Sequence, residues 1–274
     1  MSWWLIEVGM AGADPEEVAQ ALAQVTGQAV EERAASVLGY AADEPAAVAA
    51  AGAIATRFGA TVELATSPVD QADWTVRWRD GLAVRRVGRL RLGPSWLLEP
   101  GPDTVVIDPE TAFGSGEHGS TRGALALLDH WLERGASVLD LGSGSGILAI
   151  AAAKLGAKTA LGIDVDEESA PIADVNALRN QVADRVRFVT GDAAVLGPLA
   201  GPVDLVVSNI LRTVNESLLG PIARSLHEGG VAIFAGMESP EADRFRPTLA
   251  AAGFAEIGQV VDEGWWSVAA RRSR

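Results

Sequence analysis

The stretch from Val138 to Ala157, VLDLGSGSGILAIAAAKLGA, constrains the fold of this chain more than any other. Its first residues are apolar and predict a buried strand, and an alanine-rich helix begins directly after three glycines, Gly142, Gly144 and Gly146. Glycines let a backbone turn sharply and approach a ligand closely, because no Cβ stands in the way. The third glycine comes one position earlier than in the dinucleotide fingerprint, so the glycines alone do not identify the ligand.

Strands and helices alternate regularly from about residue 120 onward. Apolar runs predict strands at 137–141, 159–164, 185–190, 203–208 and 231–236, with two more around 254–260 and 265–272. Helical segments lie between them, and this alternation is typical of a mostly parallel, Rossmann-like, doubly wound sheet. Ligands of such sheets bind beyond the carboxyl ends of the strands, where the glycine loop also lies.

The N-terminal part of the chain predicts a separate small α+β domain. Its elements follow the order β-α-β-β-α-β, which is that of a ferredoxin-like sandwich. A less regular connector comes next, and residues 70–80 within it predict a short helix with Trp74 and Trp78 on one face. We interpret these two aromatic residues as packing at a domain junction rather than stacking on a ligand. The expected ranges are 1–67 for the small domain, 68–107 for the connector and 108–274 for the doubly wound domain.

The chain is strongly acidic, with a formal net charge of −14 at pH 7 over 274 residues. Such a charge repels nucleic acid at long range and attracts a basic partner, although it also serves solubility alone. The connector is an exception, because it carries six arginines: Arg77, Arg79, Arg85, Arg86, Arg89 and Arg91. We interpret them as a solvated face or as members of internal ion pairs, and contact with nucleic acid is the alternative.

Composition argues against several kinds of site and location. The chain has no cysteine, and no two of its three histidines stand at a metal-binding spacing, so we expect neither disulfides nor a metal site. The first ten residues carry no basic segment, which argues against a signal peptide. The longest apolar run, 46–55, has about half of the ~20 residues that a membrane span needs. We expect a cytoplasmic protein without membrane association, and the sequence predicts no oligomeric state.

Polar residues end three of the predicted strands. Asp164 comes 18 residues after Gly146, where a carboxylate can accept both hydroxyls of a ribose. Asp192 ends the next strand and is placed to meet an adenine edge, and Asn209 lies beyond the fourth strand. Helix capping or ordinary turns would explain any one of these residues, but not the series beside a glycine loop. The sequence therefore predicts a nucleoside site.

This arrangement resembles the Rossmann-like methyltransferases that depend on S-adenosylmethionine. Asp140, which ends the glycine strand, matches the acidic residue of that class, and the resemblance implies that it supports the loop and faces the amino-acid part of the cofactor. A closer resemblance rests on DPETAFGSGEHGSTRGALALL, GIDVDEESAPIADVNALRN, SNIL and the closing EGWW-S-V. These segments look like the PrmA family, which methylates large-subunit ribosomal protein eleven. The likeness is specific over roughly residues 70–270 and weaker before them.

The resemblance also assigns expected roles to individual residues. In the family, the segment that matches Ala112–Thr121 packs over the cofactor and shapes the mouth of the active site. The residues that fall at cofactor-binding or loop positions are Phe113, His118, Thr121, Gly142, Asp164 and Asn209. Two departures occur: Ser115 replaces a threonine but keeps the hydroxyl, and Gly119-Ser120 replaces a bulkier pair. We expect the added glycine to loosen the loop and to affect substrate preference more than cofactor binding.

Methyl transfer to amines is the activity that the resemblance implies. The expected acceptors are lysine side chains and an α-amine of the ribosomal protein, which residues 1–67 would recognise. Asn209 is expected to hold the amine, and His118 is a candidate base, although a histidine that only hydrogen-bonds the loop is favoured over it. Two alternatives remain: the same fold acting on another protein, a small molecule or RNA, and a cofactor-binding module without catalysis. The SNIL sequence argues against relatives that carry N-P-P-Y at this point.

Overall fold

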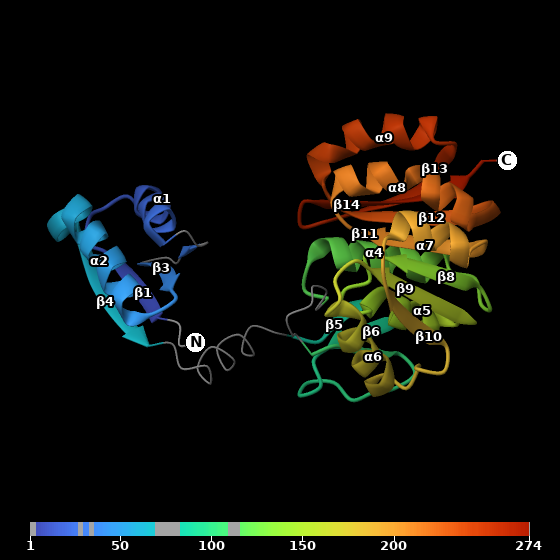
Figure 1. The fold of residues 1–274 in the computed structure, drawn as a ribbon, viewed down its shortest axis with the longest axis horizontal. Coiled ribbons are helices and arrows are strands. Elements are labelled where there is room, and N and C mark those ends of the chain that lie inside the picture. Colours follow the sequence, from blue (N-terminus) through green and yellow to red (C-terminus); the bar gives the residue numbers. More distant parts are fainter. Residues whose placement is uncertain (1–3, 27–29, 33–35, 69–82, 109–115, 274) are drawn as a thin grey trace. The chain divides into compact units, whose positions relative to one another are not determined.

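The computed structural model describes residues 4–26, 30–32, 36–68, 83–108 and 116–273 (Figure 1). Contacts divide the chain into two units, Met1–Gly81 and Leu82–Arg274, and each is described by itself below. The helix expected at 70–80, with Trp74 and Trp78, lies outside the described residues. No described helix combines the length and the apolar character needed to cross a membrane.

The first unit is a four-stranded antiparallel sheet with two helices. Its elements are β1 (Trp4–Met10), α1 (Pro15–Thr26), β2 (Glu31–Glu32), β3 (Ser36–Ala41), α2 (Glu44–Phe58), the short 3-10 turn η1 (Gly59–Thr61) and β4 (Val62–Pro68). The sheet order is β2-β3-β1-β4. Ile6 and Val8 alternate with the exposed Glu7 and pack in one apolar cluster with Leu22 of α1 and Ile54 of α2. This element order agrees with the predicted β-α-β-β-α-β pattern.

The second unit is built on a seven-stranded sheet. Its strands are β8 (Ser137–Leu141), β9 (Thr159–Asp164), β10 (Val186–Thr190), β11 (Val203–Asn209), β12 (Leu226–Glu238), β13 (Phe254–Asp262) and β14 (Trp265–Arg272). The order is β10-β9-β8-β11-β12-β14-β13, in which the first five strands are parallel and β14 is antiparallel to both neighbours. The strand order therefore reverses between β8 and β11, which is the switch point where doubly wound sheets bind ligands. The Rossmann-like fold prediction is confirmed.

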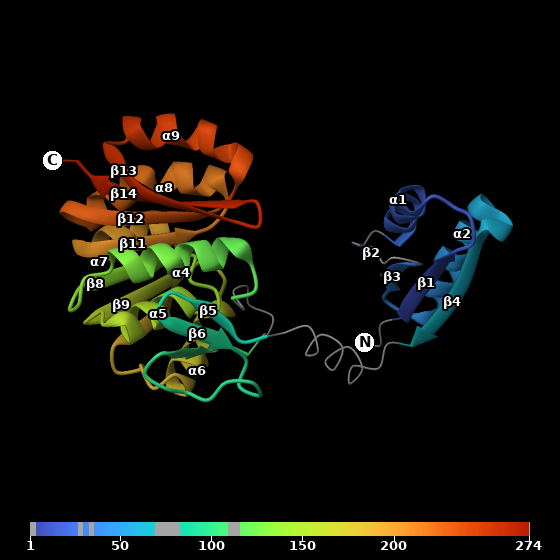
Figure 2. The same cartoon turned by 180° about the vertical axis from the view of Figure 1, so that it is seen from behind.

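Helices cover both faces of this sheet, as Figure 2 shows from behind. They are α4 (Gly119–Trp131), α5 (Ile147–Leu155), α6 (Ser169–Arg179), α7 (Ala193–Ala200), α8 (Arg212–Ser225) and α9 (Ala242–Ala251), the last after the 3-10 turn η2 (Ser239–Glu241). Neighbouring residues of β8 face opposite layers: Val138 packs in the cluster that includes α4 and α5, and Leu139 in the cluster that includes α8 and α9. A strand buried on both faces reads as the continuous apolar run seen in the sequence.

The segment 83–107 differs from the irregular connector that was expected. It forms a small sheet of β5 (Arg85–Val87), β6 (Leu90–Gly93) and β7 (Thr104–Val106), in the order β5-β6-β7. Val87, Leu90 and Val105 pack in the same apolar cluster as α4 and α5, so this sheet belongs to the second unit. Strands of three or four residues are too short to show a clear alternation of apolar and polar side chains in the sequence.

Three arginines of this small sheet form ion pairs within the second unit. Arg85 pairs with Glu117 at 2.9 Å, Arg89 with Asp129 at 2.6 Å and Arg91 with Asp103 at 3.1 Å. The three arginine side chains are 45–60% exposed, so these contacts agree with the interpretation of a solvated face with ion pairs inside the unit. Arg77 and Arg79 lie outside the described residues.

Candidate active site

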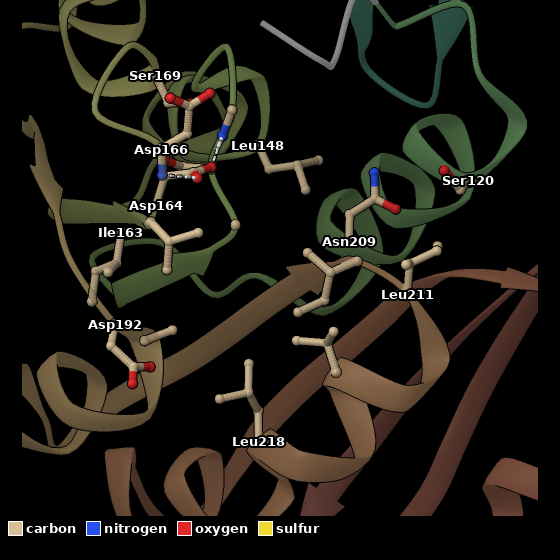
Figure 3. Close-up of a pocket in the computed structure, with 18 of the residues that line it drawn as sticks. Ser120, Leu148, Ile163, Asp164, Asp166, Ser169, Asp192, Asn209, Leu211 and Leu218 are labelled. Carbon is tan, nitrogen blue, oxygen red and sulfur yellow. Dashed lines mark hydrogen bonds between the residues drawn. The ribbon is translucent and has the colours of Figure 1, made fainter. Parts of the chain in front are cut away.

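A pocket of about 930 Å³ opens at the switch point of the sheet (Figure 3). Its lining includes the glycine loop after β8, the segments at the ends of β9, β10 and β11, the starts of α4, α5 and β14, and the first half of α8. The predicted site residues among the lining are His118, Gly142, Gly144, Asp164, Asp192 and Asn209. Figure 3 shows Asp164 and Asp192 on one side of the pocket and Asn209 and Ser120 on the other.

The glycine loop requires glycine for two physical reasons. Gly142 and Gly144 have φ angles of +73° and +49°, in the region that side-chain-bearing residues rarely adopt. A Cβ on Gly142 would also lie 2.4 Å from the Ile210 side chain. Gly146 precedes α5 with a φ of +79°, and a Cβ there would lie 2.5 Å from the Phe188 ring. Gly142 and Gly144 therefore shape the pocket, whereas Gly146 packs against the core and does not line it.

Asp164 connects the glycine loop to the end of β9. One carboxylate oxygen, Oδ2, accepts a hydrogen bond from the Gly144 amide at 2.8 Å, and Oδ1 accepts one from the Asp166 amide at 3.0 Å. Each carboxylate oxygen has a further lone pair, and the residue is only partly buried in the pocket wall. The side chain can therefore hold the loop and still accept hydroxyl groups from a ligand.

Asp192 caps α7 and lines the pocket at the same time. Its Oδ1 accepts the Ala194 amide at 2.8 Å, as a helix N-cap does. The carboxylate is exposed at the rim below Asp164. Helix capping and ligand contact are the two interpretations of Asp192. The residue caps α7 and also lines the pocket, so the two roles do not exclude each other.

Asp140 lies beneath the glycine loop rather than in the pocket wall. It is fully buried, its Oδ2 accepts the Ala149 amide of α5 at 3.0 Å, and its Oδ1 has no hydrogen-bond partner within the described part of the chain. Burial is the main cause that raises the pKa of this carboxyl to about 7, and the nearby Asp164 raises it further. The contact with α5 fits the expected support of the loop. The lining residues, however, do not include Asp140, which was expected to face the ligand.

Asn209 ends β11 with its side-chain amide oriented by α4. Its Nδ2 donates to the Thr121 hydroxyl at 3.2 Å, and Thr121 is itself fully buried. The Oδ1 atom of Asn209 is buried and accepts no hydrogen bond from any described residue. A buried acceptor without a partner carries a free-energy cost that a donor from a ligand can relieve. Thr121, which is absent from the pocket lining, acts here through Asn209.

His118 forms one edge of the pocket together with a residue that sequence reasoning did not assign to the site. Its ring lies 4.2 Å from the Trp265 ring, centroid to centroid, and its Nδ1 is 2.7 Å from the Ser120 hydroxyl. Burial lowers the pKa of His118, and the positive charge of Arg122 lowers it further. A lowered pKa makes the imidazole a weaker proton acceptor, and its contact with the Ser120 hydroxyl is of the kind expected for a histidine that hydrogen-bonds the loop. Residues 266–270 of the strand that begins at Trp265 are all buried, so no alternation in the sequence marks Trp265 as a pocket residue.

The loop from Ala112 to Thr121 is described only from Gly116 onward, so the predicted contacts of Phe113 and Ser115 lie outside the described residues. The expectation that Gly119 loosens this loop is not supported by its packing. A Cβ at Gly119 would lie 2.5 Å from the Asp262 carbonyl oxygen and 3.1 Å from the Trp265 ring. The glycine lets α4 approach the turn between β13 and β14. No cluster of three potential metal ligands occurs among the side chains that the structure describes.

Comparison with known proteins gives one consistent result. A family model described as "Ribosomal protein L11 methyltransferase (PrmA)" matches residues 1–273. A ribosomal protein L11 methyltransferase of Pelotomaculum thermopropionicum is 37% identical over 217 residues, which are 78% of this chain and 70% of that protein. The Thermus thermophilus protein of the same name is 38% identical, over 72% of this chain and 76% of its own. The crystal structure of a ribosomal protein L11 methylase from Lactobacillus delbrueckii subsp. bulgaricus superposes with a TM-score of 0.63 at 31% identity, covering 70% of this chain and 99% of that one.

Proposed function

Since the chain belongs to the PrmA family of ribosomal protein L11 methyltransferases, we propose that it uses S-adenosylmethionine to methylate amines of ribosomal protein L11. The acceptors in this proposal are lysine side chains and an α-amino group. The observation that carries it is the buried, unpartnered Oδ1 of Asn209 at the pocket wall, an acceptor suited to the N–H groups of an amine.

The size of the pocket and the chemistry of its lining residues suit the cofactor. Asp164 offers carboxylate lone pairs for the two ribose hydroxyls, and the glycine loop leaves its backbone accessible beside them. Asp192 stands at the rim where an adenine amine would be accepted, and Ile163 and Val165 supply apolar surface for the base. A cavity of about 930 Å³ is in the range of pockets that hold small molecules.

When bound, S-adenosylmethionine supplies a methyl group that is already activated on a sulfonium. The protein then has to place an amine lone pair in line with that methyl. The Thr121 hydroxyl fixes the Asn209 amide so that its Oδ1 can accept one amine N–H and orient the nitrogen. A fixed acceptor restricts the amine to geometries in which its lone pair points into the pocket.

The acceptor amine must lose a proton before its nitrogen lone pair can attack the methyl group. A lysine of pKa ~10.4 costs about 4–5 kcal/mol to deprotonate at pH 7, and an α-amine near pKa ~8 costs about 1 kcal/mol. His118 is a weak acceptor for the proton of the amine, because burial lowers the pKa of its imidazole. We therefore expect the amine to lose its proton to solvent before it enters, and the rate of lysine methylation to rise with pH up to the lysine pKa.

The first unit is proposed to recognise the acceptor protein. Residues 1–67 carry nine acidic and two basic side chains, so half of the chain's net charge of −14 resides there. A ribosomal protein is rich in basic residues because it binds RNA phosphates. Opposite charge favours the encounter of the two proteins and makes its rate depend on salt.

Transfer of labelled methyl groups to a panel of purified ribosomal proteins tests the proposal. We expect label on L11, located by mass spectrometry on amines, and loss of label when Asn209→Ala replaces the native chain. The proposal fails if the wild-type chain binds the cofactor but labels another protein, or labels L11 on atoms other than amine nitrogens.

A further inference from the structure

An ion-pair cluster joins the first turn of α4 to the turn between β13 and β14. The Arg122 guanidinium pairs with Asp262 through two hydrogen bonds of 2.7 and 3.1 Å and with Glu263 at 2.8 Å, and it also donates to the Glu117 carbonyl oxygen. The Arg122 side chain is only 11% exposed, and those of Asp262 and Glu263 are 31% and 71% exposed. The guanidinium holds the pKa of Asp262 below its usual value, so this pair stays charged at neutral pH. We call Arg122, Asp262 and Glu263 the α4 latch.

The two segments joined by the latch approach each other very closely. The missing side chain of Gly119 admits the Asp262 carbonyl, since a Cβ would lie 2.5 Å from that oxygen. One turn further along α4, a Cβ on Gly123 would lie 2.5 Å from the Ser267 hydroxyl. A side chain at Gly119 or Gly123 would therefore push α4 away from the β13–β14 turn or from β14.

The residues at the end of the pocket near Asn209, which we assign to the acceptor amine, come from two segments, and each segment is adjacent in sequence to latch residues. His118, Ser120 and Thr121 come immediately before Arg122, and Thr121 orients the Asn209 amide. Trp265, which lies against His118, follows Asp262 and Glu263 by a single glycine. No latch residue lines the pocket, so the cluster can act only by placing the residues that do.

The cofactor end is held by different contacts. Asp164 is fixed by amides of the glycine loop and of its own turn, and Asp192 by the start of α7. These segments follow β9 and β10, on the other side of the switch point from β13 and β14. A disturbance of the latch therefore reaches the acceptor end first.

We propose that Arg122 is a positioning residue for the acceptor, because its ion pairs with Asp262 and Glu263 set the His118–Trp265 edge and the Thr121–Asn209 pair. The inference rests on the proposed function, since it assigns the two ends of the pocket to cofactor and amine. It makes the β13–β14 turn, at the far edge of the sheet, part of the methyl-transfer site.

Full-length variants with paired measurements test this role. We expect Arg122→Ala to leave the calorimetric Kd for S-adenosylmethionine within about twofold and to lower kcat/KM for L11 by about tenfold or more. Arg122→Lys should recover part of the loss, because it restores the charge without the fork that binds Asp262 at two points. Asp262→Ala should add little on top of Arg122→Ala, since both changes remove one interaction.

A control arginine contacts the same strand, β13, from helix α9. Arg246 pairs with Glu256 of β13 at 2.9 Å and donates to Gln259. It also lies over the Trp266 ring, and none of these residues lines the pocket. Arg246→Ala should change methylation by less than about twofold. The inference is overturned if Arg246→Ala lowers methylation as much as Arg122→Ala does, or if Arg122→Ala weakens cofactor binding as much as methylation.

A second readout separates this inference from the proposed function. If the wild-type chain binds the cofactor without methylating L11, the proposed function fails while the latch remains testable by amide hydrogen exchange. Arg122→Ala should then speed exchange at 116–122 and 262–266 and leave the glycine loop at 142–146 unchanged. Unchanged exchange in the first two segments, or equal acceleration in all three, refutes the latch.

Discussion

Replacing Asp140 by asparagine should stabilise the second unit at alkaline pH. The carboxyl is fully buried with one oxygen unpartnered among the described residues, and burial raises its pKa from 3.8 to about 7. Asparagine has nearly the shape of the protonated acid, keeps an oxygen to accept the Ala149 amide and cannot ionise. The substitution therefore removes the cost of the buried charge and little else.

The magnitude follows from the difference between the folded and unfolded pKa values. Because the folded pKa is raised, the folded state holds its proton more tightly, and this stabilisation is complete below pH 3.8 and lost as pH rises through about 7. A difference of about three pKa units at about 1.4 kcal/mol each makes the total loss about 4 kcal/mol. Between pH 5 and pH 8 the wild-type chain should lose about 3 kcal/mol relative to Asp140→Asn.

Native-state hydrogen exchange of the β8 amides measures this difference without cofactor. Exchange of a central strand reports unfolding of the second unit, even though the chain has two units. Subtracting the unfolding free energy of the wild type from that of the variant removes the contributions of the other titrating groups, since both chains share them. We expect the protection of the two chains to converge as the pH falls toward 4 and to diverge toward pH 8.

Parallel pH profiles for the two chains would refute the reasoning. They would mean that Asp140 ionises in the folded state at no cost, and that the unpartnered oxygen is stabilised by a group outside the described residues. A variant that is less stable than wild type at every pH would show instead that the Ala149 contact requires the charge.

Three further predictions concern binding and turnover. Asp164→Ala should weaken cofactor binding by about 2–3 kcal/mol, because a charge-assisted bond to the ribose and the bond to the Gly144 amide are both lost, and unchanged affinity by calorimetry would remove Asp164 from the site. Asn209→Ala should lower kcat more than cofactor affinity, and equal losses would mean that the amide only holds the cofactor. The fragment 82–274 should bind cofactor as the full chain does but lose most methylation of L11 and most of its salt sensitivity; full activity of this fragment would place recognition elsewhere.

The sheet of the second unit was predictable because its signals are local. The parallel strands contain short, mostly apolar segments, and the glycine loop marks the strand at the switch point. Asp164, Asp192 and Asn209 could be placed for the same reason, since a residue that ends such a strand lies at the ligand edge whatever the distant chain does. The small sheet of β5 to β7 escaped prediction, because its strands have only three or four residues.

Contacts between segments that are far apart in the chain could not be predicted from the sequence. The Asn209 bond to Thr121 spans 88 residues, and the Arg122 pair with Asp262 spans 140. Arginine and aspartate are frequent in this chain, which carries many charges, and nothing in the sequence around Arg122 or Asp262 marks the two residues as partners. Gly119 illustrates the same limit, because its sequence context predicted a looser loop whereas the packing of the β13–β14 turn requires a glycine there.

The difference between local and distant contacts has a consequence for how this site can change. The proposed cofactor end is held by bonds within and between adjacent strand-end loops, so a substitution there alters directly the loop that we propose to bind the ribose. The acceptor end is assembled from the start of α4, the end of β11 and the β13–β14 turn, which meet only through tertiary contacts. Small shifts of one of these elements can move the Asn209 acceptor relative to the pocket while the cofactor contacts remain. The geometry at the acceptor end can therefore change through residues that contact neither the cofactor nor the amine. Substitution of Arg122 is the most direct way to measure such an effect on methyl transfer apart from an effect on cofactor binding.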